Sequence, residues 1–236
     1  MILAIDCGNT RLKWGLHGDG AWRRSGAVPV AGIAGLETDW MKIAAPEKVV
    51  VSNVAGESLR RKLMDILSRW SVAPVWAESK RSECGVTNNY GEPALLGPDR
   101  WAALIGAWSL RPGPCLVVTA GTATTADVLR RDGTFAGGVI IPGIDLMKRS
   151  LARDTARLPL ADGKFSDAPP RNTSDAIETG CMLAQAGAIE RMFAALEPGA
   201  MCMISGGAAM RIAPRLHVPT QVVDNLVLEG LLRIAA

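Results

Sequence analysis

The chain repeats one pattern of strands and turns, and this repeat limits the folds that it can adopt. In residues 2–16 (ILAIDCGNTRLKWGL) an apolar strand leads through a polar turn that contains glycine into a second strand. Residues 115–129 (CLVVTAGTATTADVL) show the same order. A supersecondary unit that recurs in one chain is typical of duplicated domains. We therefore expect two similar domains, residues 1–110 and residues 111–236.

Strands and helices alternate within each half. Residues 48–52 (KVVVS) are a short apolar strand, and residues 57–70 carry large apolar side chains at helical spacing. Helical periods also cover residues 99–110 and 174–196. This alternation predicts an α/β fold in which each domain is a mixed sheet flanked by helices. The polar, proline-rich stretch at residues 161–172 (ADGKFSDAPPRN) is expected to be a mobile loop.

Charge and cysteine content narrow the classes of function. The 26 Lys and Arg residues and 23 Asp and Glu residues leave a formal net charge of +3, which does not favour nucleic acid as a partner. The five cysteines include no Cys-x-x-Cys pair, so neither a disulfide framework nor a zinc site is expected. No apolar run reaches the roughly 18 residues of a membrane span, and the first residues do not form a signal peptide. We expect a cytoplasmic protein with no membrane partner.

The first turn carries the groups that a phosphate site needs. Asp6 could organise hydrated Mg²⁺, and Gly8 allows a close approach of the backbone. Polar and cationic donors follow at Asn9, Thr10 and Lys13. Because Asn and Gly also favour tight turns without any ligand, an ordinary hairpin turn is the alternative.

Two further glycine turns lie in the second half. Gly121 and Thr122 follow an apolar strand, and the threonine hydroxyl can donate to a phosphate oxygen. Gly206 and Gly207 end another strand and could contact the base or ribose of a nucleotide. If the two domains face each other, the turns could hold one nucleotide in the cleft between them. The alternative is that threonine is simply a common strand residue beside an interrupting glycine.

A carboxylate and a guanidinium are adjacent at the start of a predicted helix. Asp99 could accept the proton of a substrate hydroxyl, and Arg100 could bind an anionic group. The alternative is that Asp99 caps the helix and Arg100 is a solvated surface residue. The sequence contains neither a P-loop nor a Gly-x-Gly-x-x-Gly fingerprint, so phosphate chemistry would need a different fold.

In combination, these motifs resemble those of the type III pantothenate kinases, also called the Bvg accessory factor family, whose fold is similar to that of acetate and sugar kinases, actin and heat-shock ATPases. The resemblance implies actin-like, ribonuclease H-like domains with the active site in the cleft between them. The matching segments follow the family order. They are Asp6-x-Gly8-Asn9-Thr10, Asn89-Tyr90-x-x-Pro93-x-x-Leu96-Gly97-Pro98-Asp99-Arg100-Trp101, Gly121-Thr122-Ala123, Gly137-Gly138-x-Ile140-x-Pro142-Gly143, Asn172-Thr173, Gly206-Gly207 and Leu228-Glu229-Gly230-Leu231.

The resemblance implies transfer of the γ-phosphoryl group of ATP to the primary hydroxyl of pantothenate. The product is 4′-phosphopantothenate, and the reaction is the first step of coenzyme A biosynthesis. In this assignment Asp6 organises Mg²⁺, directly or through water. The residues implied at ATP and its phosphates are Asp6, Gly8, Asn9, Thr10, Lys13, Gly121, Thr122, Gly206 and Gly207.

On the substrate side, the resemblance implies that Asp99 is the catalytic base. The residues implied to line the pantothenate pocket are Tyr90, Gly97, Pro98, Asp99 and Arg100. Thr173 is implied to reach this pocket from a second subunit, because family members are homodimers that bind the substrate at their interface. Two other functions stay open: another small-molecule kinase of the same superfamily, and a nucleotide-binding transcriptional accessory factor without catalysis. The presence of Asp99 argues against lost catalysis.

The chain departs from the family pattern at the site of the monovalent cation. Family members usually carry Asp where this chain has Thr119, and the aspartate that often follows the late Gly-Gly pair is Ala208 here. A neutral hydroxyl offsets the charge and desolvation of K⁺ or NH₄⁺ poorly. A requirement for such a cation is therefore doubtful.

We predict weak or absent dependence of kcat on potassium or ammonium ions, unless backbone carbonyls or another carboxylate, with Asp127 nearest in sequence, complete a site. The measurement is the initial rate against potassium chloride at fixed ionic strength, with sodium or choline as replacement. Strong saturable activation would contradict the prediction. A flat response, together with potassium dependence in Thr119→Asp, would support it.

Overall fold

The described chain, residues 1–160 and 162–236 of a computed structural model, separates into two units. The first consists of Met1–Pro112, Gly133–Phe135 and Asn225–Ala236, and the second of Gly113–Asp132 and Ala136–Asp224. The chain first continues from one unit into the other within the Arg-Pro-Gly-Pro stretch at residues 111–114. The last twelve residues, which the sequence boundary placed in the second half, lie in the first unit because the final helix packs on its sheet.

The sheet of the first unit has the strand order β3-β2-β1-β4-β5. The expected hairpin is formed by β1 (Ile2–Cys7) and β2 (Arg11–Gly18), which pair antiparallel. β4 (Lys48–Asn53) runs parallel to β1 on its other side, which confirms the predicted apolar strand. The sheet edges are β3 (Ala21–Pro29) and the short β5 (Val75–Trp76).

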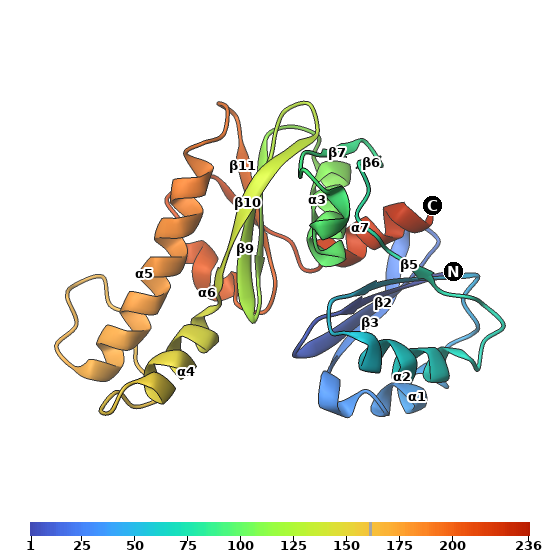
Figure 1. The fold of residues 1–236 in the computed structure, drawn as a ribbon, viewed down its shortest axis with the longest axis horizontal. Helices are drawn as coiled ribbons and strands as arrows, with labels where there is room; N and C mark the ends of the chain where they lie inside the picture. Colours follow the sequence, from blue (N-terminus) through green and yellow to red (C-terminus); the bar gives the residue numbers. More distant parts are fainter. Residues whose placement is uncertain (161) are drawn as a thin grey trace. The chain divides into compact units, whose positions relative to one another are not determined.

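Helices cover both faces of this sheet (Figure 1). α1 (Gly35–Trp40) and α2 (Glu57–Leu67) share an apolar core with Leu3 of β1 and the other side chains on its face. Because side chains alternate along a strand, Ala4 points to the opposite face, where α7 (Leu226–Ala235) contacts β1 and β4. The first strand is therefore buried on both sides, as its uninterrupted apolar sequence indicates.

Glycines allow α3 (Pro98–Leu110) and α7 to lie in close contact. A Cβ atom at Gly106 of α3 would lie 2.2 Å from the carbonyl oxygen of Leu226. A Cβ atom at Gly230 of α7 would lie only 1.7 Å from the carbonyl oxygen of Ala102. The missing side chains let the two backbones touch. Since α7 also contacts β1, this contact fixes the helix that begins at Pro98 relative to the first strand.

The remaining elements of the first unit are short. They are the strands β6 (Ser82–Glu83) and β7 (Val86–Asn88) and the 3-10 helices η1 (Val30–Gly32) and η2 (Pro93–Leu95). β10 (Thr134–Pro142) begins in this unit, where Thr134 and Phe135 pair parallel with β7, and it continues in the second unit.

The second unit repeats the strand order of the first. Its five strands are neighbours in the order β12-β11-β8-β9-β10, which is part of a seven-stranded sheet. β8 (Cys115–Ala120) and β9 (Ala123–Leu129) form an antiparallel hairpin. β11 (Met201–Ser205) and then β12 (Thr220–Val222) add parallel on the side of β8. If the five strands of each unit are numbered along the chain, both units have the strand order 3-2-1-4-5. The repeat expected from the sequence is therefore present in the topology.

One face of the second sheet is covered by α4 (Ile144–Asp154), α5 (Thr173–Phe193) and α6 (Ala209–Ile212), with η3 (Ala213–Arg215) after α6 (Figure 1). The predicted long helix is thus confirmed with slightly different ends. Residues 162–172 form neither helix nor strand, which agrees with the predicted loop, and Ala161 lies outside the described residues.

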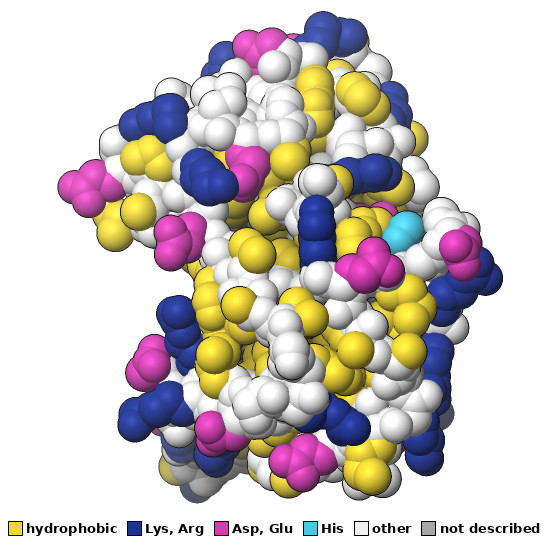
Figure 2. Space-filling model, turned by 90° about the vertical axis from the view of Figure 1, so that its right-hand side faces the viewer, with side chains coloured by type: hydrophobic (Ala, Val, Ile, Leu, Met, Phe, Trp, Pro, Cys, Tyr) yellow, Lys and Arg dark blue, Asp and Glu magenta, His cyan; other side chains and the backbone are white. Residues whose placement is uncertain are grey.

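The surface carries charges of both signs. Figure 2 shows Lys and Arg side chains interspersed with Asp and Glu side chains on one face of the molecule. In the residues that the structure describes, no helix combines the length and the apolar character that a membrane crossing needs.

Gly230→Ala should lower the free energy of unfolding by about 2–3 kcal/mol, because the added methyl group must separate α7 from α3. Gly187→Ala is the matched control in the interior of α5, where a Cβ atom would meet nothing within 4 Å, and it should be neutral or stabilising by up to about 1 kcal/mol. Urea unfolding of both variants measures this. Equal changes at the two positions would refute the role assigned to the helix contact.

Candidate functional site

The first polar turn closes directly after β1. The N–H of Gly8 donates to the carbonyl oxygen of Arg11 over 3.1 Å, and a Cβ atom at Gly8 would lie 3.2 Å from the same oxygen. Asn9 and Thr10 are exposed at the tip of the turn. The turn is therefore tight where it leaves the sheet, and its polar side chains are exposed at the tip. The hairpin is confirmed, and phosphate binding by it stays a prediction.

Asp6, near the end of β1, carries a carboxylate oxygen without a partner. Its Oδ1 atom is shielded from solvent and has no hydrogen-bond partner among the described residues. Burial raises the pKa of Asp6 to about 7, with a further contribution from the charge of Asp99, while Lys13 acts in the opposite direction. Lys13 lies opposite Asp6 in the register of β1 and β2. A cation near Oδ1 would supply the missing partner and offset the excess negative charge.

Asp99 contributes the second carboxylate from the start of α3. Gly97 is the N-cap and Pro98 the first helical residue, so Asp99 lies one position further in and does not occupy the cap. Its Oδ1 atom accepts a hydrogen bond of 2.8 Å from the backbone N–H of Arg100. Burial raises the pKa of Asp99, although backbone hydrogen bonds and the charge of Arg100 oppose the rise. A Cβ atom at Gly97 would lie 2.6 Å from Oδ1, so glycine leaves room for this carboxylate.

Arg100 is buried beside a pair of aromatic rings and is not a solvated surface residue. Only 7% of it is exposed, and its Nη1 atom donates to the hydroxyl of Tyr90 over 3.2 Å. Its guanidinium carbon lies 5.9 Å from the ring centre of Tyr90 and 5.8 Å from that of Phe135. These cation–π contacts hold the guanidinium in place.

A second arginine fixes the loop that carries Tyr90. Arg81 donates from Nη1 to the carbonyl oxygens of Asn88 (2.8 Å) and Tyr90 (2.9 Å), and from Nη2 to that of Gly91 (3.1 Å). Sequence reasoning identified neither Arg81 nor Phe135. No local motif marks them, because Arg81 lies just before β6 and Phe135 belongs to β10.

The turn after β8 is joined to the residue that precedes α4. The N–H of Gly121 donates to the carbonyl oxygen of Ala123 over 2.9 Å, and the N–H of Gly143 donates to that of Thr122 over 2.9 Å. A Cβ atom at Gly143 would lie 2.2 Å from the carbonyl oxygen of Gly121. Backbone therefore packs directly on backbone at this turn.

The late glycine pair meets the same end of β8. Gly206 has a φ of +105°, and a Cβ atom there would lie 2.3 Å from the carbonyl oxygen of Ala120. Ala208 donates its N–H to this oxygen over 3.1 Å. A Cβ atom at Gly207 would meet nothing within 4 Å, so the surface beside this residue is open. The structure thus brings the two predicted turns of the second unit together.

Thr119 and Asp127 share one face of the second sheet. Thr119 is half-buried and pairs with Thr125, and strand alternation places Asp127 on the same side, two residue pairs further along. The Asp127 carboxylate lies over the backbone of β10, where a Cβ atom at Gly138 would be 2.0 Å from Oδ1. A role of either residue in cation binding stays a prediction.

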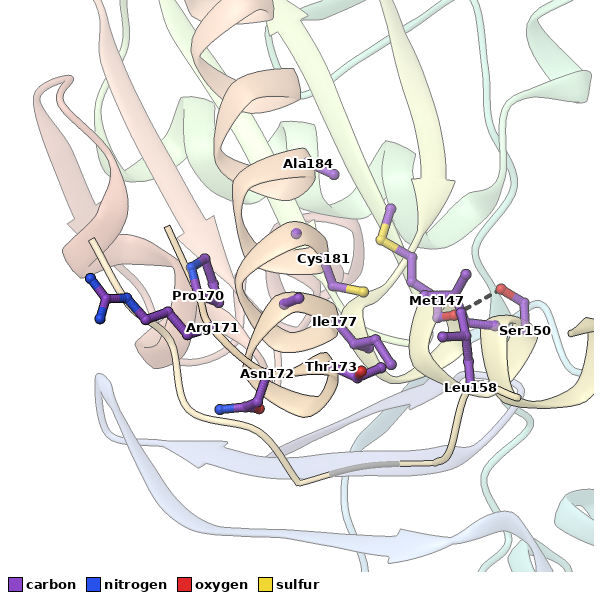
Figure 3. A pocket seen from close by; sticks show the side chains of 13 residues that line it. Met147, Ser150, Leu158, Pro170, Arg171, Asn172, Thr173, Ile177, Cys181 and Ala184 are labelled. Atoms are coloured by element: carbon purple, nitrogen blue, oxygen red, sulfur yellow. Dashed lines mark hydrogen bonds between the residues drawn. The ribbon is translucent and has the colours of Figure 1, made fainter. Parts of the chain in front are cut away.

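Thr173 lies in the second unit at the rim of a cavity of about 850 Å³. It is the first residue of α5, after Asn172, whose side chain accepts a hydrogen bond from the N–H of Asp175. Figure 3 shows Met147 and Cys181 facing each other across this cavity. Thr173 is exposed, as a residue that contacts a second molecule must be.

The fold defines the class of this protein. A crystal structure described as a Baf family transcriptional activator from Campylobacter jejuni matches with a TM-score of 0.68 and 21% identity, over 98% of this chain and 96% of that chain. A structure described as a 2-dehydro-3-deoxygalactonokinase from Sinorhizobium meliloti matches with a TM-score of 0.62 and 15% identity, over 98% of this chain and 97% of that chain. The chain has the fold shared by actin-like ATPases and sugar kinases.

Sequence relatives identify the family. The family model described as type III pantothenate kinase matches residues 2–195. A protein named type III pantothenate kinase from Aromatoleum aromaticum is 50% identical over 237 residues, which cover 100% of this chain and 98% of that protein. The chain belongs to the type III pantothenate kinase family.

The raised pKa of Asp6 predicts a pH-dependent cost in stability. Between about pH 4 and pH 7 the folded protein keeps a proton on Asp6 that the unfolded chain releases, so the free energy of unfolding falls as the pH rises. Asp6→Asn should therefore be more stable than the wild type above pH 7, by up to about 4 kcal/mol, and equal to it below pH 4.

Urea unfolding from pH 4 to pH 8, without Mg²⁺ or nucleotide, tests this difference. Asp65→Asn, at an exposed position of α2, is the control and should follow the wild-type profile. A stability difference between Asp6→Asn and the wild type that does not change with pH would contradict the assignment.

Proposed function

We propose that this protein transfers the γ-phosphoryl group of ATP to the primary hydroxyl of pantothenate and forms 4′-phosphopantothenate, the first step of coenzyme A biosynthesis. The proposal rests above all on the two carboxylates of the first unit. Asp6 has a shielded oxygen without a partner among the described residues, and Asp99 lies close enough for its charge to raise the pKa of Asp6. In a chain of this family, one carboxylate suits a metal and the other suits a hydroxyl proton.

Mg²⁺ fits at Asp6. Within residues 1–160 and 162–236, no group of three His, Cys, Asp or Glu side chains is placed to hold a metal ion. An ion at Asp6, bound directly or through water, would therefore take most ligands from phosphate oxygens and water, as Mg²⁺ commonly does in phosphoryl transfer. When bound, it neutralises charge that develops on the phosphates.

The turns are assigned to ATP because they offer donors and close backbone approach. Their exposed tips and absent Cβ atoms support this role. Lys13 adds a cation beside Asp6. The phosphate and nucleotide ligands in this proposal are Gly8, Asn9, Thr10, Lys13, Gly121, Thr122, Gly206 and Gly207.

Asp99 is assigned the role of base toward the pantothenate hydroxyl. The hydrogen bond from Arg100 N–H fixes the carboxylate, and burial raises its pKa toward the range where it exchanges protons efficiently. A weak base is sufficient, because the substrate hydroxyl loses its proton late in a loose transition state of phosphoryl transfer. The N-terminal turn of α3 thus orients the group that meets the attacking oxygen.

Arg100 is assigned to the carboxylate of pantothenate. Its guanidinium is held by Tyr90 and Phe135, so little side-chain entropy is lost when an anion binds. Gly97 and Pro98 complete the pocket on this side. We assign Thr173 to the same pocket in a second subunit of a homodimer, which is consistent with its exposed position. The protein would act in the cytoplasm, where ATP is available.

ADP release in a coupled assay tests the substrate. Activity is expected with pantothenate and Mg²⁺, and formation of 4′-phosphopantothenate identifies the product. Sugars, glycerol and acetate are the comparison substrates. Turnover of a sugar but not of pantothenate would assign the chain to another kinase function, and no turnover with any of them would favour the accessory-factor role.

Asp99→Asn should lower kcat by about 10²-fold or more, while the KM for ATP stays within about twofold, because only the proton acceptor is lost. The amide oxygen can still accept the hydrogen bond from Arg100 N–H, so the helix start is preserved. Asp65→Asn is the control for a surface carboxylate in the same unit. An unchanged kcat would leave Asp99 with a structural role only.

A further inference from the structure

Each turn of the second unit lies directly beside the start of a helix. Gly143, which packs on the turn at Gly121 and Thr122, is directly followed by α4. Gly206 and Gly207 are followed by α6, with Ala208 as its N-cap. The position of each turn therefore depends on what holds the helix behind it.

A buried carboxylate of α5 joins these two helices. Glu178 Oε2 accepts a hydrogen bond of 2.9 Å from Lys148 Nζ of α4, and Glu178 Oε1 accepts one of 2.9 Å from Arg211 Nη2 of α6. Arg211 also donates to Asp145 in the first turn of α4 over 3.2 Å. Lys148 has a longer ion pair of 3.9 Å with Asp162. One carboxylate therefore connects α4, α5 and α6, which all lie on one face of the sheet (Figure 1).

The charges at the centre of this network are poorly solvated. Lys148 is 8% exposed and Glu178 is 7% exposed. Burial alone would raise the pKa of Glu178, but the hydrogen bonds from Lys148 and Arg211 outweigh it and the pKa is lowered. Removing one partner of a buried pair leaves the other charge uncompensated. The observed positions of α4, α5 and α6 are therefore strongly preferred over positions that would separate Lys148 or Arg211 from Glu178.

A neighbouring amide adds a second attachment between α5 and the same region. Gln185, two helical turns after Glu178, is fully buried and donates from Nε2 to the carbonyl oxygen of Pro142 over 2.7 Å. Pro142 directly precedes Gly143. Helix α5 thus holds both the entry to α4 and its second turn.

We propose that Glu178 is a positioning residue that sets the separation of the two nucleotide turns by fixing α4 and α6 to the same helix. This inference rests on the proposed function insofar as it takes these turns to bind ATP. The helices determine the position of the turns because backbone hydrogen bonds join them. Gly143, before α4, donates to Thr122 in the first turn, and Ala208, before α6, donates to Ala120 at the end of β8. The Glu178 network is the next fixed point along each helix.

Glu178→Gln tests the proposal, with Glu190→Gln as the matched control. Glu190 lies on the same helix and accepts a hydrogen bond from His217 N–H, away from both turns. For Glu178→Gln we expect the KM for ATP to rise about tenfold while the KM for pantothenate stays within about twofold. In the free protein, amide hydrogen exchange at residues 121–122 and 206–208 should become about tenfold faster. The control should change neither quantity.

Two one-sided variants separate positioning from general destabilisation. Arg211→Gln removes the links of α6 to Glu178 and to Asp145 but leaves the pair of Lys148 and Glu178 in place. It should speed amide exchange at residues 206–208 more than at 121–122. Lys148→Met removes the link between Glu178 and α4, together with the longer ion pair to Asp162, and should show the reverse order. Arg211 is partly exposed, so this variant decides the question if Glu178→Gln does not fold.

The exchange measurement does not depend on catalysis, so it separates the two proposals. If the wild type lacks kinase activity but the one-sided variants show their opposite patterns, the proposed function fails and the positioning role stands. If folded variants leave exchange in both turns unchanged, or raise it equally throughout the unit, Glu178 only stabilises the fold. A parallel rise in KM for both substrates would also overturn the proposal.

Discussion

Direct contact between backbones, without intervening side chains, is the constraint on which this structure depends. It occurs where α3 crosses α7 at Gly106 and Gly230, and where Gly143 and Gly206 meet the end of β8. At each place a Cβ atom would lie within 2.3 Å of a carbonyl oxygen. Such contacts have no flexible side chain that could absorb a small displacement. They therefore transmit the position of a helix directly to the strand or turn beside it, and the candidate site is built on these rigid connections.

The candidate site combines this rigidity with unfavourable electrostatics. Asp6 and Asp99 are both partly removed from water, and each has a pKa above that of a free carboxyl group. In the second unit, by contrast, the buried carboxylate of Glu178 is paired with two cations. The protein thus pairs the carboxylate that holds helices together, and it leaves a shielded oxygen without a partner among the described residues on Asp6, one of the two carboxylates that we assign to the reaction.

The sequence was informative where local chemistry decides the structure. The hairpins, the apolar strands, the helix that begins at Pro98 and the repeat of strand order follow from residue spacing and turn composition. The C-terminal helix was assigned to the wrong half of the chain by proximity in sequence, because its partner Ala102 is more than a hundred residues away. Arg81 and Phe135 were missed because no sequence motif records their contacts with the Tyr90 loop and with Arg100, which only the folded chain brings together.

The return of helix α7 to the first unit has a consequence for dividing the protein into fragments. Residues 225–236 cover one face of β1 and β4. A fragment of residues 1–112 would leave this apolar face uncovered and prone to aggregation. A fragment of residues 113–224 would contain every residue of the second unit. The second unit is thus an insertion into the first, and a single cut in the chain cannot separate the two.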